Sequence, residues 1–404
     1  MMKAFLQPFQ ELAEAEEILK CLKKNKGVLQ VSGCMESQKA HLMYGLSGIF
    51  PRRLILAEDE RRAKAIYEDY RFYDKNVWFY PAKDLLFFQA DIHGNLLIRQ
   101  RMQVVKALLE EKELTVVTSV DGCMDFLAPL EKIKNSLLTY RNDSELDLEK
   151  LKAALVEMGY ERVGQVEMPG QFSIRGGIVD IYPLTEENPW RIELWGDEID
   201  SIRSFDAQSQ RSLENLEEIT IYPAGEETGG KESVSFLEYF PKEDTLVFLD
   251  EPNRLEENGR AVEEEFLQSR KNREEKGCQT LSEDWLCSYD ELVKELNQRN
   301  CVSVCSLEQK QAGWKISGRF HLTVRSVSSY NSSFELLVKD LRQYKQQGYQ
   351  IALLCGSRTR AQRLAKDLQD EGLNAFYGQD FDRLIQPGEI MVVYGHAKKG
   401  FEYP

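Results

Sequence analysis

The chain has 404 residues, a length that suggests two to four domains at ~100–200 residues each. Hydrophobic residues make up 42% and charged residues 29%, a composition that excludes a disordered, collagen-like or coiled-coil chain. With 52 basic and 67 acidic side chains, the net charge of -15 argues against a protein whose main task is to coat phosphate backbones. It does not exclude a local basic patch. No segment approaches the ~20 apolar residues that a membrane span requires.

The eight cysteines and four histidines are scattered along the chain. No two cysteines form a CxxC pair, so the spacing of a zinc site is missing. Free, buried thiols are typical of a reducing compartment. We therefore expect a cytoplasmic protein without a bound metal.

Strand and helix patterns alternate through residues 1–130. Short apolar, β-branched runs at 28–31, 53–57, 77–80 and 114–118 predict strands, and residues 95–111 predict a helix. This alternation is typical of βαβ units around a parallel sheet.

The pattern changes over residues 131–222. A strand at 136–141 and a helix ended by Gly159 precede a block of short strands and glycine turns over 165–222, which predicts antiparallel sheet. This segment holds 10 basic and 19 acidic residues, so it carries about nine of the excess negative charges.

Two further segments follow a polar, Gly/Glu-rich junction at 225–233. α/β character resumes with an apolar strand at 245–249, and a last α/β block begins near residue 328. We therefore predict four units, at residues 1–130, 131–222, 223–327 and 328–404. The predicted fold class is α/β, a helicase-like parallel sheet with an inserted antiparallel β-rich (α+β) unit and a second, small α/β unit.

The first strand runs into a degenerate phosphate loop. Gly33 and Lys39 match the P-loop pattern G-x-x-x-x-G-K-[ST], but Gln38 replaces the second glycine and Ala40 replaces Ser/Thr. Glycine permits the turn that aims amides at phosphate, and the lost hydroxyl would ligate Mg²⁺. An ordinary strand–turn–helix is the plain alternative.

Asp250 and Glu251 follow the apolar strand at 245–249. This pair resembles a Walker B arrangement, although a strand that ends in a polar turn explains it as well. Together with the degenerate phosphate loop, this acidic pair suggests a nucleotide-binding fold that has lost its ATP chemistry. We expect neither ATP binding nor hydrolysis, and no cofactor.

Strand alternation places unusual residues on one polar face. In Trp190 to Trp195 the even positions are apolar, so Arg191, Glu193 and Trp195 point the other way, as does Arg175 in its own strand. Trp and Arg dominate binding hot spots. The alternative is that Trp195 covers a neighbouring loop or helix.

The segment Gly170 to Pro183, with its continuation Arg191 to Ile199, is similar to a motif shared by the excision-repair protein UvrB and the bacterial transcription-repair coupling factor, Mfd. Leu249 to Arg254 and the end from Gly395 to Pro404 resemble the coupling factor more than UvrB. The resemblance identifies the chain as the N-terminal part of a coupling factor. It covers nearly all of the chain, more loosely outside these blocks.

The resemblance implies a UvrB-like module with a degenerate ATP site and a β-rich unit that docks UvrA, the damage-sensing ATPase. The residues that match the family's UvrA contacts are Arg175, Arg191 and Trp195, with Glu193 as a further candidate. Ser173 departs from the family, whose usual residue there is Arg. The junction at 225–233 is also far shorter than in relatives.

The resemblance further implies a longer parent protein, an ATP-dependent DNA translocase. Its RNA polymerase and DNA contacts would lie in domains after residue 404, and its C-terminal parts would mask the UvrA surface. The leading hypothesis is a non-enzymatic module that recruits UvrA to stalled RNA polymerase. The rivals are a residual nucleotide-binding or DNA-stimulated ATPase module, and DNA binding by the module itself, which the net charge disfavours.

Overall fold

The computed structural model describes residues 2–24, 27–83, 94–226, 232–277, 286–310, 312–327, 330 and 333–404. Its centre is a seven-stranded sheet in the order β17-β1-β16-β15-β2-β4-β3, and every strand pair in it is parallel. The expected parallel sheet is therefore confirmed. Its strands are β1 (Gly27–Ser32), β2 (Arg52–Ala57), β3 (Val77–Tyr80), β4 (Leu114–Ser119), β15 (Thr245–Asp250), β16 (Asn300–Val304) and β17 (Ile316–His321).

Residues 1–130 and 223–327, which the sequence separates, build this sheet together. β15, β16 and β17 come from the second range, and β15 pairs with β2 while β16 pairs with β1. The β-rich unit is thus inserted into the chain between two halves of one sheet. The sites after β1 and β15 lie at the same edge of the sheet, because both strands pair in parallel with β16 between them.

Helices cover both faces of the sheet, so its strands are apolar on both sides. In β2, Leu54 and Leu56 pack into one core while Ile55 and Ala57 pack into the other. The first core includes α5 (Gly94–Glu110), α6 (Val120–Cys123), α7 (Leu130–Ser136), η2 (Phe236–Tyr239), α9 (Pro252–Glu275) and α10 (Tyr289–Leu296), beside the strand pair β5 (Phe126–Leu127) and β14 (Val234–Ser235). The second core includes α1 (Lys3–Gln10), α2 (Ala15–Lys24), α3 (Glu36–Leu46), η1 (Ser47–Ile49) and α4 (Glu60–Tyr70).

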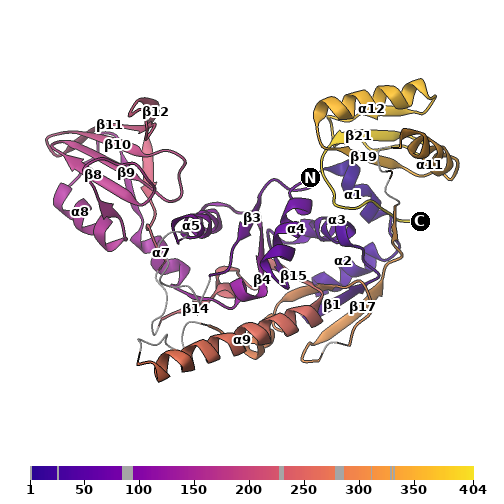
Figure 1. Cartoon of the computed structure of the whole chain (residues 1–404), viewed down its shortest axis with the longest axis horizontal. Helices are drawn as coiled ribbons and strands as arrows, with labels where there is room; N and C mark the ends of the chain where they lie inside the picture. Colours follow the sequence, from indigo (N-terminus) through magenta and orange to yellow (C-terminus); the bar gives the residue numbers. More distant parts are fainter. Residues whose placement is uncertain are drawn as a thin grey trace.

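The β-rich unit lies at one end of the long axis of the molecule (Figure 1). Its six-stranded sheet has the order β12-β11-β10-β9-β8-β7 and is antiparallel except for the pair β7–β8. Glu186 ties this unit to α5, because Lys106 Nζ lies 2.6 Å from its carboxylate and Arg99 donates to its carbonyl oxygen. The elements are β6 (Leu138–Arg141), α8 (Leu148–Glu157), β7 (Glu161–Arg162), β8 (Gln171–Arg175), β9 (Ile178–Tyr182), β10 (Trp190–Trp195), β11 (Glu198–Phe205), β12 (Ser212–Leu216) and β13 (Glu218–Ile221), which pairs with β6.

A small α/β unit lies at the opposite end of the long axis (Figure 1). Its parallel sheet β19-β21-β20 packs on the second core through Met391 and Val393, and the Ala4 amide donates to the carbonyl oxygen of Phe381. The small unit is thus docked on α1 and its neighbours. Its elements are β18 (Arg325–Ser326), α11 (Phe334–Gln346), β19 (Ile351–Cys355), α12 (Arg358–Asp370), β20 (Ala375–Tyr377), β21 (Ile390–Tyr394) and β22 (Phe401–Glu402), which pairs with β18.

Candidate functional site

The degenerate phosphate loop folds as a tight strand-to-helix turn. Gly33 has φ of +81°, and a Cβ at this position would lie 2.1 Å from the carbonyl oxygen of Leu322, so only glycine fits. The side chain of Gln38 is buried, and its Oε1 accepts a hydrogen bond from the Met35 amide at 3.1 Å. A loop amide of the kind that binds phosphate in a functional P-loop is therefore satisfied by the protein itself. Ala40, also buried, offers no hydroxyl.

Lys39 and the acidic pair after β15 meet in a buried ion cluster. Lys39 Nζ lies 2.7 Å from Asp250 Oδ1 and 2.7 Å from Glu251 Oε1, and 3% of the Lys39 side chain is exposed. Arg62 adds a second cation, with its Nε 2.6 Å from Asp250 Oδ2. Burial alone would lower the pKa of Lys39, but the two carboxylates outweigh it and raise this pKa. Burial would raise the pKa of Asp250, and Lys39 and Arg62 hold it below its usual range instead.

The structure thus brings together the Lys39, Asp250 and Glu251 side chains that the sequence singles out. Glu251 has a left-handed backbone, with φ of +52°, and accepts hydrogen bonds from the Ser306 amide and hydroxyl, each at 2.7 Å. In a working site the lysine would bind phosphate and the acids would hold Mg²⁺. Here each of these charges already has a partner within the protein, which is an arrangement for stability.

The segment after β21 covers the start of α3. The Tyr403 hydroxyl accepts from Gln38 Nε2 at 3.1 Å and lies 2.8 Å from His41 Nδ1. The Lys399 amide donates to Ser37 Oγ at 3.0 Å. The helix of the degenerate loop therefore packs against the last residues of the chain, and sequence reasoning missed this contact.

Two of the predicted partner-binding residues, Arg175 and Arg191, share a buried acid on the polar face of the six-stranded sheet. Asp180 on β9 is 1% exposed and lies between β8 and β10. Its carboxylate accepts from Arg191 Nε at 2.6 Å, from Arg191 Nη2 at 2.9 Å and from Arg175 Nη2 at 2.7 Å. Arg191 also donates to Gln210 Oε1, and its guanidinium lies 4.4 Å from the centre of the Phe205 ring.

These contacts distinguish the two arginines. Only 14% of the Arg191 side chain is exposed, whereas 47% of the Arg175 side chain is. The hydrogen bond to Asp180 stabilises the charged form of Arg191. This effect outweighs the opposing effect of burial, so the pKa of Arg191 is raised. Arg191 is mainly a part of the sheet, and Arg175 keeps donors for another molecule. Ser173, the departure from the family, is buried and donates to the carbonyl oxygen of Gly164.

Trp195 ends β10 at the rim of the same sheet. Its side chain is 84% exposed, so the alternative that it covers a neighbouring loop or helix is wrong. The turn after β8 is joined to β10, because the Leu194 amide donates to the Gly177 carbonyl oxygen at 2.8 Å. Trp195 and Arg175 each end a strand before a hairpin turn. Glu193, the fourth candidate, accepts from Arg203 and from the Ser201 hydroxyl.

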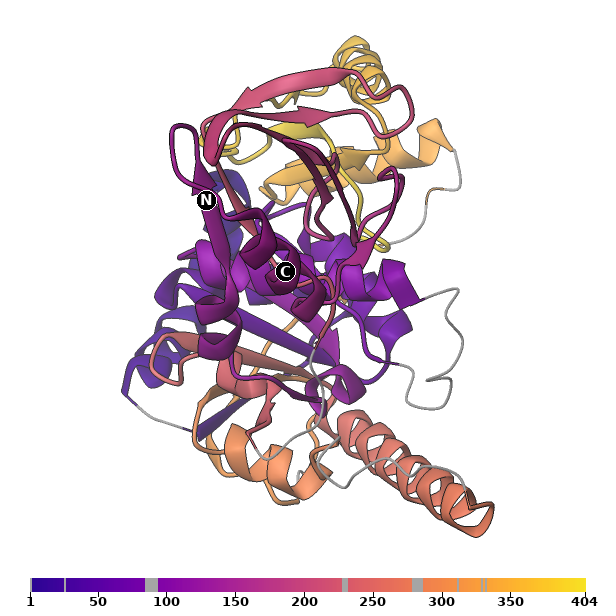
Figure 2. The same ribbon diagram turned by 90° about the vertical axis from the view of Figure 1, so that its left-hand side faces the viewer.

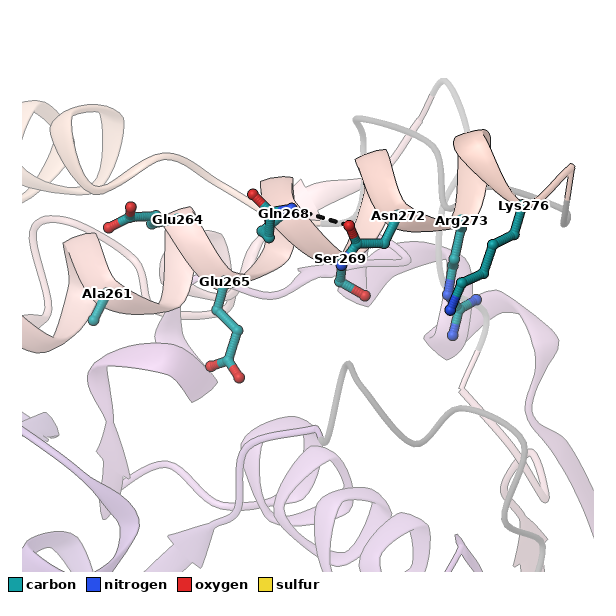
Figure 3. A pocket seen from close by; sticks show the side chains of 8 residues that line it. All are labelled: Ala261, Glu264, Glu265, Gln268, Ser269, Asn272, Arg273 and Lys276. Carbon is teal, nitrogen blue, oxygen red and sulfur yellow. Dashed lines mark hydrogen bonds between the residues drawn. The ribbon is translucent and has the colours of Figure 1, made fainter.

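A hollow lies elsewhere, along α9. It has a volume of about 660 Å³ and is lined by one face of α9, whose end projects from the body of the molecule (Figures 2 and 3). Figure 3 shows Glu265, Arg273 and Lys276 pointing from α9 toward the body, and none of the predicted site residues lies there. The residues that line this hollow carry charges of both signs, and their arrangement does not indicate a ligand.

Neither a metal site nor a membrane-spanning helix is present among the described residues. No group of three or more His, Cys, Asp or Glu side chains among them could hold a metal ion. None of the helices in this part of the chain is both long and apolar enough to cross a membrane. The predicted junction at 225–233 falls largely outside the described part of the chain, since residues 227–231 are not described.

Comparison with known proteins finds a matching domain and relatives of this chain. Residues 138–226 match the UvrB interaction domain, and this range begins at the first residue of β6. The transcription-repair-coupling factor of Bacillus subtilis is 27% identical over 93% of this chain and 38% of its own length. The same factor of Staphylococcus aureus strain USA300 is 25% identical over 82% of this chain and 33% of its own length.

The chain therefore spans little more than a third of the length of the relatives that it matches. The matched range contains the whole six-stranded sheet, with Arg175, Asp180, Arg191 and Trp195. Residues 138–226 match the UvrB interaction domain, and the chain as a whole is related to the transcription-repair-coupling factors.

Proposed function

We propose that this chain is a non-enzymatic interaction module and that its β-rich unit binds UvrA, the damage-sensing ATPase of nucleotide excision repair. The observation that carries the proposal is the exposed Trp195 at the same rim as Arg175, in a sheet that matches the UvrB interaction domain. An 84% exposed Trp contributes little to the stability of its own fold. It is the kind of residue that anchors a protein interface.

The rim supplies two different contacts. Trp195 offers a large apolar ring, and Arg175 offers the donors that Asp180 leaves free. Asp197 and Glu198, at the same turn, are acidic and exposed. The complementary surface would therefore hold an apolar pocket for the Trp195 ring, an acid facing Arg175 and basic groups around them, with long-range charge setting the approach.

In the longer proteins to which this chain is related, we propose that the module recruits UvrA to stalled RNA polymerase and that C-terminal parts mask the rim until then. The rival, a residual nucleotide-binding module, is supported by the meeting of Lys39 with Asp250 and Glu251. The ion pairs among these residues make it the weaker proposal, because ATP would have to break them.

The test is the affinity of this chain for immobilised UvrA, measured by biolayer interferometry. Trp195→Ala should weaken binding by roughly 30-fold or more, since an interface anchor contributes about 2 kcal/mol or more. Trp195→Phe should retain most of the affinity. Leu213→Ala, which truncates a 52% exposed residue on β12 of the same unit, is the matched control. Equal affinities for the wild type and Trp195→Ala would overturn the proposal.

A further inference from the structure

A group of exposed basic residues belongs to the small α/β unit, which lies at the opposite end of the long axis from the β-rich unit (Figure 1). It forms where β19 and β21 end side by side, with Cys355 paired to Tyr394 and the Gly395 amide donating to the Cys355 carbonyl oxygen at 3.0 Å. The chain then continues into α12 after β19 and into residues 396–400 after β21. We call this surface the basic edge and define it by Arg358, Arg360, Lys398, Lys399 and Tyr394.

The charge of this edge contrasts with the rest of the chain. Residues 356–366 and 394–401 hold six Lys/Arg and no Asp/Glu, although the whole chain carries a net charge of -15. Arg358, Arg360, Lys398 and Lys399 are exposed, and none of them forms an ion pair with a described residue. Tyr394, the last residue of β21, is 53% exposed, and it lies between Arg360 and Lys398 in the sequence.

Few acids face the edge. Asp69 of α4 accepts a hydrogen bond from the Lys398 amide at 3.3 Å, and Asp367 lies 3.8 Å from Arg363 on α12. Elsewhere on the chain, arginines at structural positions are matched with carboxylates, as Arg191 is with Asp180 and Arg62 with Asp250. The four cations that follow the paired ends of β19 and β21 lack such a carboxylate among the described residues, so the packing of the small unit does not require their charge.

We propose that the basic edge binds the phosphate backbone of duplex DNA. Ligands of open α/β sheets bind outside the carboxyl ends of the strands, which is where these residues lie. Arginine and lysine are the residues that contact DNA phosphates without regard to sequence, and an exposed tyrosine adds contacts to the sugar–phosphate chain. DNA binding is thus a property of the basic edge alone, although the whole chain has a net negative charge.

The density of cations favours DNA over an acidic protein. Four cations without an accompanying apolar patch suit a uniform polyanion, whereas protein interfaces gather aromatic and apolar residues at their centre. This proposal does not depend on UvrA binding, because the two surfaces lie at opposite ends of the molecule (Figure 1).

The experiment measures fluorescence anisotropy of a labelled 30-base-pair duplex with the wild-type chain at several salt concentrations. Four phosphate contacts predict a log–log salt slope of about -3.6, which is a loss of roughly 150-fold in affinity between 50 and 200 mM salt. Arg358→Ala with Arg360→Ala should reduce the slope to about -1.8 and the loss to roughly tenfold. The matched control is Lys339→Ala with Lys345→Ala, which removes the same charge from exposed positions on α11 of the same unit.

A smaller slope for the Arg358/Arg360 variant, with the control unchanged, would support the proposal. Absence of duplex binding at 50 mM salt, or equal slopes for the two double variants, would overturn it. If polyglutamate binds the wild-type chain more tightly than the duplex does, the partner is an acidic protein and not DNA. Circular dichroism melts of both variants show whether the small unit remains folded.

Discussion

Arg191 donates to both carboxylate oxygens of Asp180, from Nε at 2.6 Å and from Nη2 at 2.9 Å. The pair joins the neighbouring strands β9 and β10 at directly opposed positions. Because Asp180 also accepts from Arg175, one buried carboxylate fixes the guanidinium groups of both arginines. Arg191 therefore acts on the proposed UvrA-binding rim mainly through the carboxylate that it holds in place.

The first prediction concerns Asp180→Asn, which keeps the shape of the side chain and removes its charge. Breaking a buried pair by removing one partner costs about 3 kcal/mol, because the remaining charge is left uncompensated. We expect faster hydrogen exchange of the β9 and β10 amides, measured by mass spectrometry, and a loss of UvrA affinity of at least tenfold.

A double-mutant cycle separates the contributions of the two arginines. Arg175→Ala should weaken UvrA binding with little change in amide exchange, since this side chain is half exposed. Asp180→Asn should cost less affinity in the Arg175→Ala background than in the wild type, because part of its effect passes through Arg175. Wild-type exchange and wild-type affinity for Asp180→Asn would contradict this account. Unchanged affinity for Arg175→Ala with Arg191→Ala would remove both residues from the site.

How far the sequence predicts this site depends on the range of each interaction. Strand alternation correctly places Trp195 and Arg191 on the face opposite Trp190, because alternation is a local property of the chain. Asp180 escapes prediction because it sits within an apolar run and meets Arg191 only through strand pairing. A charged residue at an outward position of such a run is the signal that could have found it.

The degenerate loop combines features that a local pattern predicts with contacts that it does not. Its lost glycine and hydroxyl are readable from Gln38 and Ala40 alone. The contact of Gln38 with Tyr403 joins residues that are 365 positions apart, and no local pattern encodes it. Short apolar runs likewise predict the strands of the central sheet. They do not predict that β15 and β16 lie between β1 and β2, since strand order is set by tertiary packing.

The second prediction concerns Lys39→Ala. This change leaves Asp250 and Glu251 buried without the side chain that forms an ion pair with both of them, so we expect a loss of about 3–5 kcal/mol in stability. Differential scanning calorimetry should show a lower melting temperature. Lys64→Ala is the matched control, because this exposed lysine pairs with Glu60 on the surface of α4, where such pairs contribute at most about 1 kcal/mol.

Isothermal titration with Mg–ATP completes the test of the degenerate loop. The wild type should give no binding heat, since the lysine and both acids already pair with one another. Saturable ATP binding that is lost in Lys39→Ala, with an unchanged melting temperature, would favour the nucleotide-binding rival instead.

The third prediction concerns the pH dependence of stability at His41. Its Nε2 lies 2.6 Å from the Phe5 carbonyl oxygen, which can only accept, so Nε2 carries the proton and Nδ1 accepts from the Tyr403 hydroxyl. Burial lowers the pKa of His41 to about 4, although the Phe5 hydrogen bond opposes this shift. The Tyr73 and Tyr403 hydroxyls beside it titrate far higher, because burial raises the pKa of each.

The direction of the effect follows from proton binding. Between the unfolded pKa of about 6.5 and the folded value, the unfolded chain binds a proton that the folded chain does not. Stability is therefore fully present above about pH 6.5 and falls with acidification, by about 2 kcal/mol at pH 5 and about 3 kcal/mol near pH 4. Calorimetry of the wild type and His41→Gln from pH 7.5 to 5 isolates this contribution as the difference between their melting temperatures. A constant difference across that range would mean that His41 is not held neutral between Phe5 and Tyr403.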